Sequence, residues 1–424
     1  MLKDLLKFAL KLMAQSVLWR HRPRIVAVTG SVGKTSTKDA ISHVLSRKFS
    51  VWKSTGNYNN ELGVPLTILG MKTGKRSIFL WLKVVFGFFV LMLRKVYPQI
   101  LVLEMGADRK GDILYLCKIA KPEIAIVTRV GAAHLEHFGD VETVQREKAQ
   151  LVVGLQGRGV AILNADDPRV SAMKHLHKGK VVTFGFSSGA DVLAEDVRLI
   201  QNTSQSQMDP RRDLGLSFVI SSGSRKSPLI ARGILGQPQV YSLLAAFAVA
   251  FELGMETREV VSALESYQSP PGRLRPLLGI KRTVILDDTY NSSPEAAIEA
   301  MKILRQIRGK RRVAVLGDML ELGPAAESSH RQLGRLAKSL GVDLLLTVGE
   351  LARFIADEAR TSGFAKTKIS TFDTADKAGL PLQNKMQEGD VVLIKGSRGM
   401  HMEKIVLEVM AEPEKAGELL YHPD

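Results

Sequence analysis

Short apolar runs alternate with helical stretches through most of the chain. In the first half these runs occupy 25–28, 100–105, 124–127 and 160–163, and each is bounded by turn or helix signals. Strands that are apolar on both faces are typical of a parallel sheet covered by helices on each side. The pattern therefore predicts α/β architecture with a mostly parallel sheet.

A polar segment interrupts this alternation. Residues 189–235 contain clusters of Ser, Gln and Asp around short strand candidates such as 216–220, which favours a β-rich excursion. The alternation then resumes in four apolar runs, at 283–288, 312–318, 343–349 and 391–396. We expect these runs to form a second, Rossmann-like α/β domain.

A cluster of turn residues marks the seam between the two halves. Ser269 to Gly272 reads Ser-Pro-Pro-Gly, a strong turn signal. We place the main boundary there, with a central domain over 23–270 and a C-terminal domain over 271–424. The length of 424 residues and the 45% share of hydrophobic residues fit two or three packed globular domains.

The first residues predict an amphipathic helix over 1–22. Its apolar positions recur at helical spacing, at Leu2, Leu5, Leu6, Ala9 and Met13. No small-residue cleavage site follows, so a signal peptide is not expected. The pattern allows this helix either to dock on its own domain or to lie on a membrane.

A second apolar helix is predicted over 78–93, with one charge at Lys83 and the basic pair Arg94 and Lys95 behind it. Such a helix is about 24 Å long, whereas a bilayer core of about 30 Å needs about 20 residues. The apolar runs on either side belong to one predicted domain, which a membrane span would separate. The insertion, taken as 76–97, is therefore an interfacial helix, a docking surface or a buried core helix.

The charge balance limits the kinds of partner that the chain could bind, and the cysteine content indicates its compartment. The chain carries 59 Lys and Arg against 43 Asp and Glu, a formal net charge of +16. A membrane surface, a phosphorylated substrate or a merely solvated basic surface would fit, and no nucleic acid is expected because no nucleic-acid-binding motif accompanies the charge. The single cysteine, Cys117, excludes an intrachain disulfide and fits a cytoplasmic protein.

The segment TGSVGKTST, residues 29–37, follows the first predicted strand and precedes a helical stretch. In such a loop, backbone N–H groups cradle phosphate, the lysine reaches the terminal phosphates and the next threonine binds Mg²⁺. Val28 stands where the common phosphate-loop pattern has glycine, so this is the shorter T-G-x-x-G-K-T form. The expected nucleotide contacts are Gly30, Ser31, Gly33, Lys34, Thr35 and Ser36.

Further polar motifs follow the phosphate loop in order. In the first half they are TGNYNNELGVPLT (55–67), LEMGADRKGDI (103–113), GAAHLEHFGD (131–140) and EKAQL (147–151). In the second half they are PGRLRP (271–276), DDTYNSSP (287–294), VLGDMLELG (315–323) with His330, and KGSRGMHMEK (395–404). From residue 24 to about 410, this combination resembles the Mur ligase family, and most closely its members that add D-alanyl-D-alanine.

The resemblance implies ATP-dependent amide formation, in which ATP phosphorylates a carboxylate and an amine then displaces the phosphate. It assigns Lys34 to the β- and γ-phosphates, Thr35 and Glu104 to one Mg²⁺, and His134 to a second Mg²⁺. Lys148 matches the family's carbamylated lysine, whose added carboxylate lies beside the metals. From the residues alone, an ordinary surface lysine and a core histidine remain alternatives for the last two.

The asparagine-rich loop has two readings. The resemblance places Asn57, Asn59 and Asn60 where their amides contact phosphate or the acceptor carboxylate, with Asn57 on the nucleotide. Turn formation is the alternative role for asparagines in such a loop.

In the second half, Arg273 matches the family's hinge arginine, which approaches the ATP phosphates, and Asp288 matches the acid that binds ribose, whereas Asp287 has a structural alternative. The groups expected to face the incoming peptide and the acyl donor are Tyr290, Asn291, Lys395, Ser397 and Arg398. Closure of the C-terminal domain over ATP is implied, because these groups would otherwise lie far from the phosphate loop.

Three features depart from the family pattern. Only 28 residues precede the phosphate loop, where related ligases carry a domain that recognises a UDP-linked sugar. Pro238 stands where the family has a histidine near the adenine, and the apolar insertion separates two elements that the family joins briefly. The missing domain and the apolar helix together suggest peripheral membrane association through 1–20 and 76–97.

The resemblance implies an ATP-dependent ligase that adds D-alanyl-D-alanine to a UDP-muramoyl-tripeptide or a related peptidoglycan precursor. We expect a monomer with two Mg²⁺ ions, in the cytoplasm or at the inner face of the membrane. A lipid-linked or other carboxylate acceptor is one alternative, and a non-catalytic ATP-binding scaffold at the membrane is another. The retained phosphate and metal residues favour the enzyme.

Overall fold

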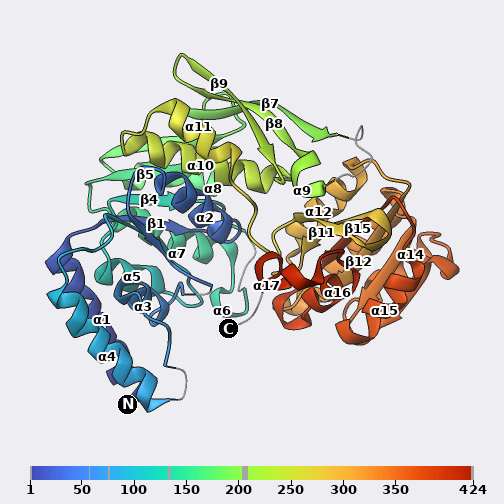
Figure 1. Cartoon of the computed structure of the whole chain (residues 1–424), viewed down its shortest axis with the longest axis horizontal. Helices are drawn as coiled ribbons and strands as arrows, with labels where there is room; N and C mark the ends of the chain where they lie inside the picture. The colour runs from blue at the N-terminus through green and yellow to red at the C-terminus, as the bar shows by residue number, and fades with distance from the viewer. Residues whose placement is uncertain (1, 57, 75–76, 132–134, 203–208, 422–424) are drawn as a thin grey trace. The chain divides into compact units, whose positions relative to one another are not determined.

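The computed structural model groups the chain into two compact units (Figure 1). The first comprises Met1–Glu195, Val219–Leu229 and Pro238–Tyr267, and the second comprises Asp196–Phe218, Ile230–Gln237 and Gln268–Asp424. The structure describes residues 2–56, 58–74, 77–131, 135–202 and 209–421. Segments of the β-rich excursion belong to both units.

The first sheet has nine strands in the order β2-β3-β1-β4-β5-β6-β7-β8-β9 within the described residues. All pairings from β2 to β7 are parallel, which confirms the predicted parallel sheet. The strands are β1 (Arg24–Thr29), β2 (Val51–Lys53), β3 (Ile100–Glu104), β4 (Ile124–Val127), β5 (Val160–Asn164), β6 (Lys180–Gly185), β7 (Val192–Gln201), β8 (Leu214–Ser222) and β9 (Arg225–Arg232). The last three form the β-rich excursion predicted around 216–220.

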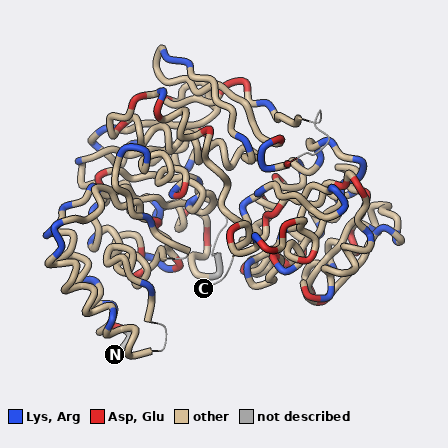
Figure 2. Tube along the Cα trace, viewed as in Figure 1, with Lys and Arg blue, Asp and Glu red and all other residues tan. Residues whose placement is uncertain are grey.

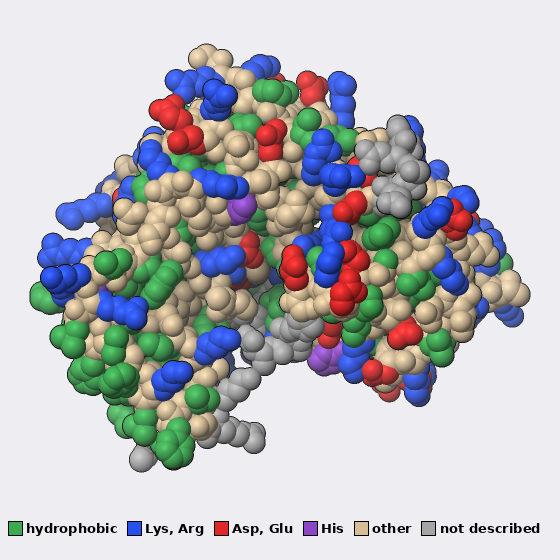
Figure 3. All heavy atoms as spheres, in the orientation of Figure 1, with side chains coloured by type: hydrophobic (Ala, Val, Ile, Leu, Met, Phe, Trp, Pro, Cys, Tyr) green, Lys and Arg blue, Asp and Glu red, His purple; other side chains and the backbone are tan. Residues whose placement is uncertain are grey.

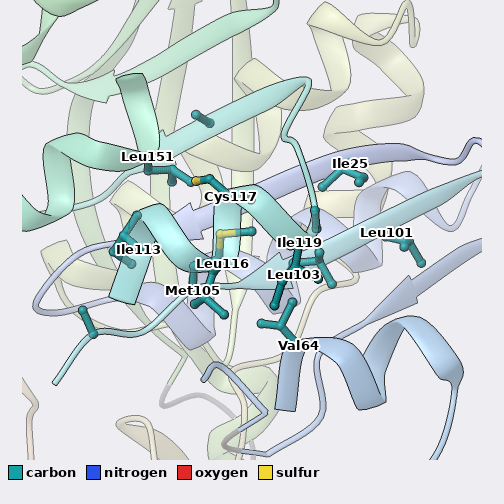
Figure 4. Close-up of a cluster of buried hydrophobic side chains, with 14 of the residues drawn as sticks. Ile25, Val64, Leu101, Leu103, Met105, Ile113, Leu116, Cys117, Ile119 and Leu151 are labelled. Carbon is teal, nitrogen blue, oxygen red and sulfur yellow. The ribbon is translucent and has the colours of Figure 1, made fainter. Parts of the chain in front are cut away.

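Helices cover both faces of this sheet, because its strands are apolar on both faces. One core joins alternate strand residues, such as Ile25, Leu101 and Leu103, to the helices α1 (Leu2–His21), α3 (Gly63–Leu69), α4 (Ile78–Leu93), α5 (Asp112–Ile119) and α7 (Val141–Val153); Figure 4 shows part of it. The remaining helices between β1 and β10 are α2 (Lys34–Leu45), α6 (Leu135–Phe138), α8 (Pro168–Ser171), α9 (Pro210–Asp213), α10 (Gln237–Glu252) and α11 (Thr257–Glu265).

Cys117 lies inside this core, on α5 beside Leu116 and Leu151 (Figure 4). Burial raises the pKa of its thiol to about 12. A Cβ added at Gly154, the residue after α7, would lie 2.8 Å from the sulfur, so the end of this helix also packs tightly against the thiol. The only cysteine of the chain is therefore a core residue.

The second unit is built on a six-stranded sheet in the order β10-β11-β15-β12-β13-β14. Its strands are β10 (Arg275–Gly279), β11 (Thr283–Asp288), β12 (Arg311–Gly317), β13 (Leu344–Val348), β14 (Ile369–Phe372) and β15 (Asp390–Lys395). Of the strand pairings that the structure describes in this sheet, β10–β11 alone is antiparallel. Helices α12 (Pro294–Gln306), α13 (Ala326–Ser339) and α14 (Arg353–Thr361) pack on one face, and α15 (Ala375–Lys385) and α16 (Glu403–Val409) on the other; α17 (Ala416–Leu419) follows. The predicted Rossmann-like domain is confirmed.

The predicted apolar helix is α4, and its bounds are those expected from the sequence. Only Val84, Gly87 and Leu91 of this helix are buried, so the reading of a buried core helix is wrong. Among the described residues, no helix combines the length and the apolar character needed to cross a membrane.

Candidate active site

The phosphate loop connects β1 to α2 and depends on two glycines. Gly30 and Gly33 have φ values of 145° and 87°, which side-chain-bearing residues rarely adopt. A Cβ at Gly30 would lie 2.1 Å from the hydroxyl of Thr128, which follows β4. That hydroxyl donates to the carbonyl of Val32 over 2.7 Å, and the N–H of Ser31 donates to the carbonyl of Arg129 over 2.7 Å. The segment after β4 therefore fixes the shape of the loop.

A lysine and a helix N-terminus bring positive charge to this loop. The ammonium of Lys34 lies over the loop, where it donates to the carbonyls of Gly30 (2.8 Å) and Ser31 (3.3 Å). Lys34 also begins α2, whose first turn contains no acidic residue. A helix N-terminus with exposed N–H groups and a lysine favours anions, and phosphate above all. The predicted contacts Thr35 and Ser36 lie in the same turn.

Glu104 brings a buried carboxyl group to the same edge of the sheet. It ends β3 and is paired in register with Val28, the residue before the last one of β1. Its side chain is almost fully buried, and its Oε1 accepts a hydrogen bond of 3.1 Å from the amide of Asn59. Oε2 has no hydrogen-bond partner among the described residues. A buried carboxylate oxygen without a protein donor is suited to a hard cation such as Mg²⁺.

Lys148 lies on α7 and is only 2% exposed. Burial, with a further contribution from the positive charge of Lys34, lowers its pKa to about 7. Within the described part of the chain, its ammonium makes no hydrogen bond or ion pair. The reading of an ordinary surface lysine is therefore wrong, and at neutral pH about half of this side chain is an uncharged amine.

The asparagine-rich loop packs against the Glu104 strand. Besides its bond to Glu104, Asn59 accepts at its carbonyl from the N–H of Gly106 over 2.7 Å. Asn60 uses its side-chain oxygen locally, accepting from the N–H groups of Leu62 (3.2 Å) and Gly63 (2.9 Å) at the start of α3. Asn59 thus reaches the candidate metal ligand, while the side chain of Asn60 shapes the turn.

Two predicted site residues, Asn57 and His134, lie outside the described residues. Within the described ranges, no group of three or more His, Cys, Asp and Glu side chains is arranged to hold a metal ion. The candidate cation ligands that the structure does describe are the hydroxyl of Thr35 and the carboxylate of Glu104. Phosphate oxygens of a bound nucleotide would complete such a set.

In the second unit, the predicted site residues surround the end of β11. Asp288 and Lys395 form an ion pair of 2.6 Å, and Lys395 also donates to the carbonyl of Asn291 over 3.0 Å. The other oxygen of Asp288 accepts from the N–H of Leu274 over 3.1 Å. The structure therefore pairs two groups that were expected on different ligands.

Asp287 is fully buried and serves the backbone. It accepts from the N–H of Gly272 over 2.9 Å and from the hydroxyl of Thr289 over 2.7 Å. Burial raises its pKa to about 6. Its contacts agree with the structural alternative considered for this residue.

A cation–aromatic cluster lies beside this ion pair. The guanidinium of Arg273 stacks 3.9 Å from the ring centre of Tyr290. Arg398 lies 5.7 Å from the same ring and 4.9 Å from that of Tyr421, and the two tyrosine rings are 4.8 Å apart. Three predicted residues, Arg273, Tyr290 and Arg398, are thus brought together, and Tyr421 joins them.

Ser397 and His330 are internal to the second unit. The hydroxyl of Ser397 accepts from the N–H of Leu320 over 2.9 Å and is almost fully buried. The Nε2 atom of His330 accepts from the N–H of Met319 over 2.9 Å, and its Nδ1 donates to the carbonyl of Ala326 over 2.6 Å. Both side chains hold the loop after β12.

Sequence reasoning missed three residues of these sites. Thr128 fixes the phosphate loop, and Glu147 accepts from the N–H groups of Gly111 and Ile113 (2.8 Å each), which anchors the start of α5 beside Lys148. Tyr421 joins the aromatic cluster. Only Glu147 carried a signal, because it is adjacent to Lys148 in the motif EKAQL.

Models of two protein-family domains match this sequence. The model for the Mur ligase middle domain matches residues 28–81 and 87–250, and the model for the Mur ligase glutamate ligase domain matches 272–398. The chain belongs to the Mur ligase family, as the order of its motifs indicated.

Two curated relatives have the same name. The UDP-N-acetylmuramoyl-tripeptide–D-alanyl-D-alanine ligase of Bacillus subtilis is 30% identical over 406 residues, which cover 96% of this chain and 80% of the relative. The ligase of the same name from Mycobacterium tuberculosis CDC 1551 is 33% identical over 410 residues, 92% of this chain and 73% of the relative.

Solved structures agree with the sequence relatives. A crystal structure of MurF from Acinetobacter baumannii superposes with a TM-score of 0.77 at 29% identity, covering 95% of this chain and 80% of that one. MurF from Thermotoga maritima in complex with ADP gives a TM-score of 0.78 at 28% identity, covering 96% and 84%.

Proposed function

We propose that the protein is an ATP-dependent ligase that joins D-alanyl-D-alanine to a UDP-N-acetylmuramoyl-tripeptide through an acyl phosphate. The observation that carries this proposal is the gathering, in one compact unit, of a phosphate loop, a buried carboxylate oxygen of Glu104 and a buried lysine with a lowered pKa. The names of the similar proteins supply the substrates.

In the first step, a carboxylate oxygen of the tripeptide attacks the γ-phosphorus of ATP. The bond between that phosphorus and the bridging oxygen breaks, and ADP leaves with the electron pair. Lys34 and the N–H groups at the start of α2 hold the phosphate oxygens and stabilise their charge. To do so, Lys34 exchanges its bonds to two loop carbonyls for bonds to phosphate.

In the second step, the amine of D-alanyl-D-alanine attacks the carbonyl carbon of the acyl phosphate. The tetrahedral intermediate collapses, the C–O bond to phosphate breaks, and the amine proton passes to phosphate or water. Arg398, held against two tyrosine rings, has the planar guanidinium that binds a peptide carboxylate through two parallel hydrogen bonds. It is our candidate for orienting the incoming dipeptide.

Thr35 and Glu104 fit a magnesium ion, because Thr35 lies in the first turn of α2 and Glu104 Oε2 is buried with no protein donor in the described chain. A bound Mg²⁺ would neutralise charge on the phosphate oxygens. His134 is proposed for a second ion from the resemblance.

We also propose that Lys148 is carbamylated. A neutral amine adds to CO₂ to give a carbamate and releases one proton, and the lowered pKa keeps about half of Lys148 neutral at pH 7. Carbon-13 NMR of the protein equilibrated with ¹³C-bicarbonate tests this step. A carbamate signal that is absent from Lys148→Met supports it, whereas equal spectra of the two proteins contradict it.

The ligase itself is tested by phosphate release from ATP and Mg²⁺ with UDP-muramoyl-tripeptide, D-alanyl-D-alanine, or both. Release that needs both substrates, with a pentapeptide product detected by mass, is the expected result. Lys34→Ala should abolish release, while Lys53→Ala, which removes an exposed ion pair with Asp39, should not. ATP binding without release would instead favour a lipid-linked acceptor or a non-catalytic scaffold.

A further inference from the structure

The first helix, α1, is apolar on two opposite sides. Leu10, Ala14 and Val17 are buried in the core of the first compact unit. Leu5, Phe8, Leu12 and Trp19 follow one another at spacings of three, four and seven residues, so they form one stripe on the opposite side. All four are exposed, Trp19 to 72%.

The helix α4 repeats this arrangement beside α1. It packs through Val84, Gly87 and Leu91. The Nε2 atom of His21, at the end of α1, donates a hydrogen bond of 3.0 Å to the carbonyl of Leu91. Its outer side is also apolar, with Phe79 exposed to 83% and Phe86 to 70%. In the space-filling view, the side chains of α1 and α4 form an apolar area that we call the α1–α4 surface (Figure 3).

Basic residues border the α1–α4 surface. Residues 71–97 contain six Lys and Arg and no Asp or Glu. Lys72 precedes α4, Arg94 and Lys95 follow it, and Arg20 lies at the adjoining end of α1; all four side chains are exposed. Figure 2 marks this distribution of basic residues along the trace.

From these observations we infer that the α1–α4 surface binds the face of an anionic lipid bilayer. Helices that lie in a membrane interface combine an apolar side rich in Phe, Leu and Trp with basic residues at its border. At sixteen residues, α4 is about 24 Å long and too short for a span, but it suits a position parallel to the bilayer. This inference does not depend on the ligase reaction.

The basic residues also indicate which partner binds the α1–α4 surface, a bilayer or a second copy of the chain. Two copies that met through this surface would bring two sets of basic residues together, which like-charge repulsion opposes. An anionic leaflet offers the complementary charge and attracts each nearby Lys or Arg by about 1 kcal/mol. The bilayer is therefore the occupant that the charge distribution favours.

Flotation of the full chain with lipid vesicles tests the inference. We expect the protein to float with vesicles that contain phosphatidylglycerol and to float much less with phosphatidylcholine alone. On binding, Trp19 should leave water, so the tryptophan emission should shift to the blue, and Trp19→Phe should remove most of this shift. Trp52 and Trp81, the other two tryptophans, are already partly buried.

Two matched pairs of variants locate the binding surface. Leu82→Ser with Phe86→Ser replaces two exposed side chains of α4 and should abolish flotation. The control, Leu380→Ser with Leu407→Ser, changes two exposed leucines of the second unit and should bind like the unchanged protein. Replacing Arg94 and Lys95 by Gln should weaken binding to anionic vesicles about 25-fold, at about fivefold for each charge.

Three outcomes would overturn the inference: no flotation with either vesicle, flotation that is unaffected by the Leu82 and Phe86 replacements, or a dimer in sedimentation that these replacements dissociate. The last would assign the surface to a second copy. Thermal unfolding of each variant shows separately that it is folded. Phosphate release without vesicles then tells failure of membrane binding apart from failure of the ligase proposal.

Discussion

Two lysines, one in each compact unit, are buried to the same extent but differ in the contacts of their ammonium groups. Lys148 and Lys395 are both 2% exposed. Lys395 forms an ion pair of 2.6 Å with Asp288 and a hydrogen bond of 3.0 Å with the carbonyl of Asn291. Lys148 has neither kind of contact within the described chain, and its pKa falls to about 7.

The difference separates a structural charge from a reactive amine. A buried ammonium either keeps its charge through a close partner or loses its proton. Lys395 keeps its charge through its ion pair with Asp288, which links β15 to the end of β11. Lys148 has no such partner within the described chain, so burial favours loss of its proton. The charge of the nearby Lys34 lowers the pKa of Lys148 further.

The sharpest test replaces the unpaired lysine. Lys148→Met should lower ligase activity by about 10³-fold, because it removes a charge-stabilising group of the site. The free energy of unfolding should change little, since no ion pair or hydrogen bond is lost within the described chain. Phosphate release and thermal unfolding measure the two effects, with the exposed Lys118→Met on α5 as the control. Full activity in Lys148→Met would remove Lys148 from the mechanism.

Replacing the paired lysine should have the reverse effect on stability. Lys395→Met leaves Asp288 without its ammonium and should lower the free energy of unfolding by about 3 kcal/mol. Calorimetry should show a decrease in Tm of roughly 6–12 °C. The double variant Asp288→Asn with Lys395→Met should regain part of the loss. A single variant as stable as the unchanged protein would show that this pair does not stabilise the fold.

The pH dependence of activity provides a third test. Carbamylation needs the neutral amine, and with a pKa of about 7 the neutral fraction of Lys148 falls about fivefold between pH 7 and pH 6. Activity after equilibration in bicarbonate at each pH should fall by a similar factor. A flat profile from pH 6 to 8 would contradict the carbamate.

The smallest expected effect concerns stability at mild acidity. Burial lowers the pKa of His330, whose neutral ring accepts from the N–H of Met319. The folded pKa lies below the unfolded one, so this stability is complete above pH 6.5 and decreases as the pH falls through the folded value. Tm should drop by a few degrees between pH 7 and 5, and less in His330→Gln. An equal drop in both proteins would assign the effect elsewhere.

The fold was predictable because its strands are apolar on both faces. The predicted run 124–127 coincides with β4, and 283–288 coincides with β11. The contribution of the β-rich excursion to both units was not predictable, because no local pattern encodes which distant strands it joins.

The candidate site was predictable only where a motif carries it. Lys34, Glu104 and Lys148 lie in three separate motifs, and the structure places them in one unit. The ion pair of Asp288 with Lys395 joins residues 107 positions apart, and no pattern announces it. The exposure of α4 could not be predicted either, because the sequence of an apolar helix does not show whether other parts of the protein cover it.

The burial of Cys117 has a practical consequence for measuring movement in this enzyme. A thiol whose pKa is raised to about 12 presents almost no thiolate at neutral pH, so maleimide dyes should leave it unmodified. A cysteine introduced at an exposed position of each compact unit would then be the only labelled pair, without any change to the native sequence at 117. Energy transfer between two such dyes would follow, one molecule at a time, whether the C-terminal domain closes when nucleotide arrives.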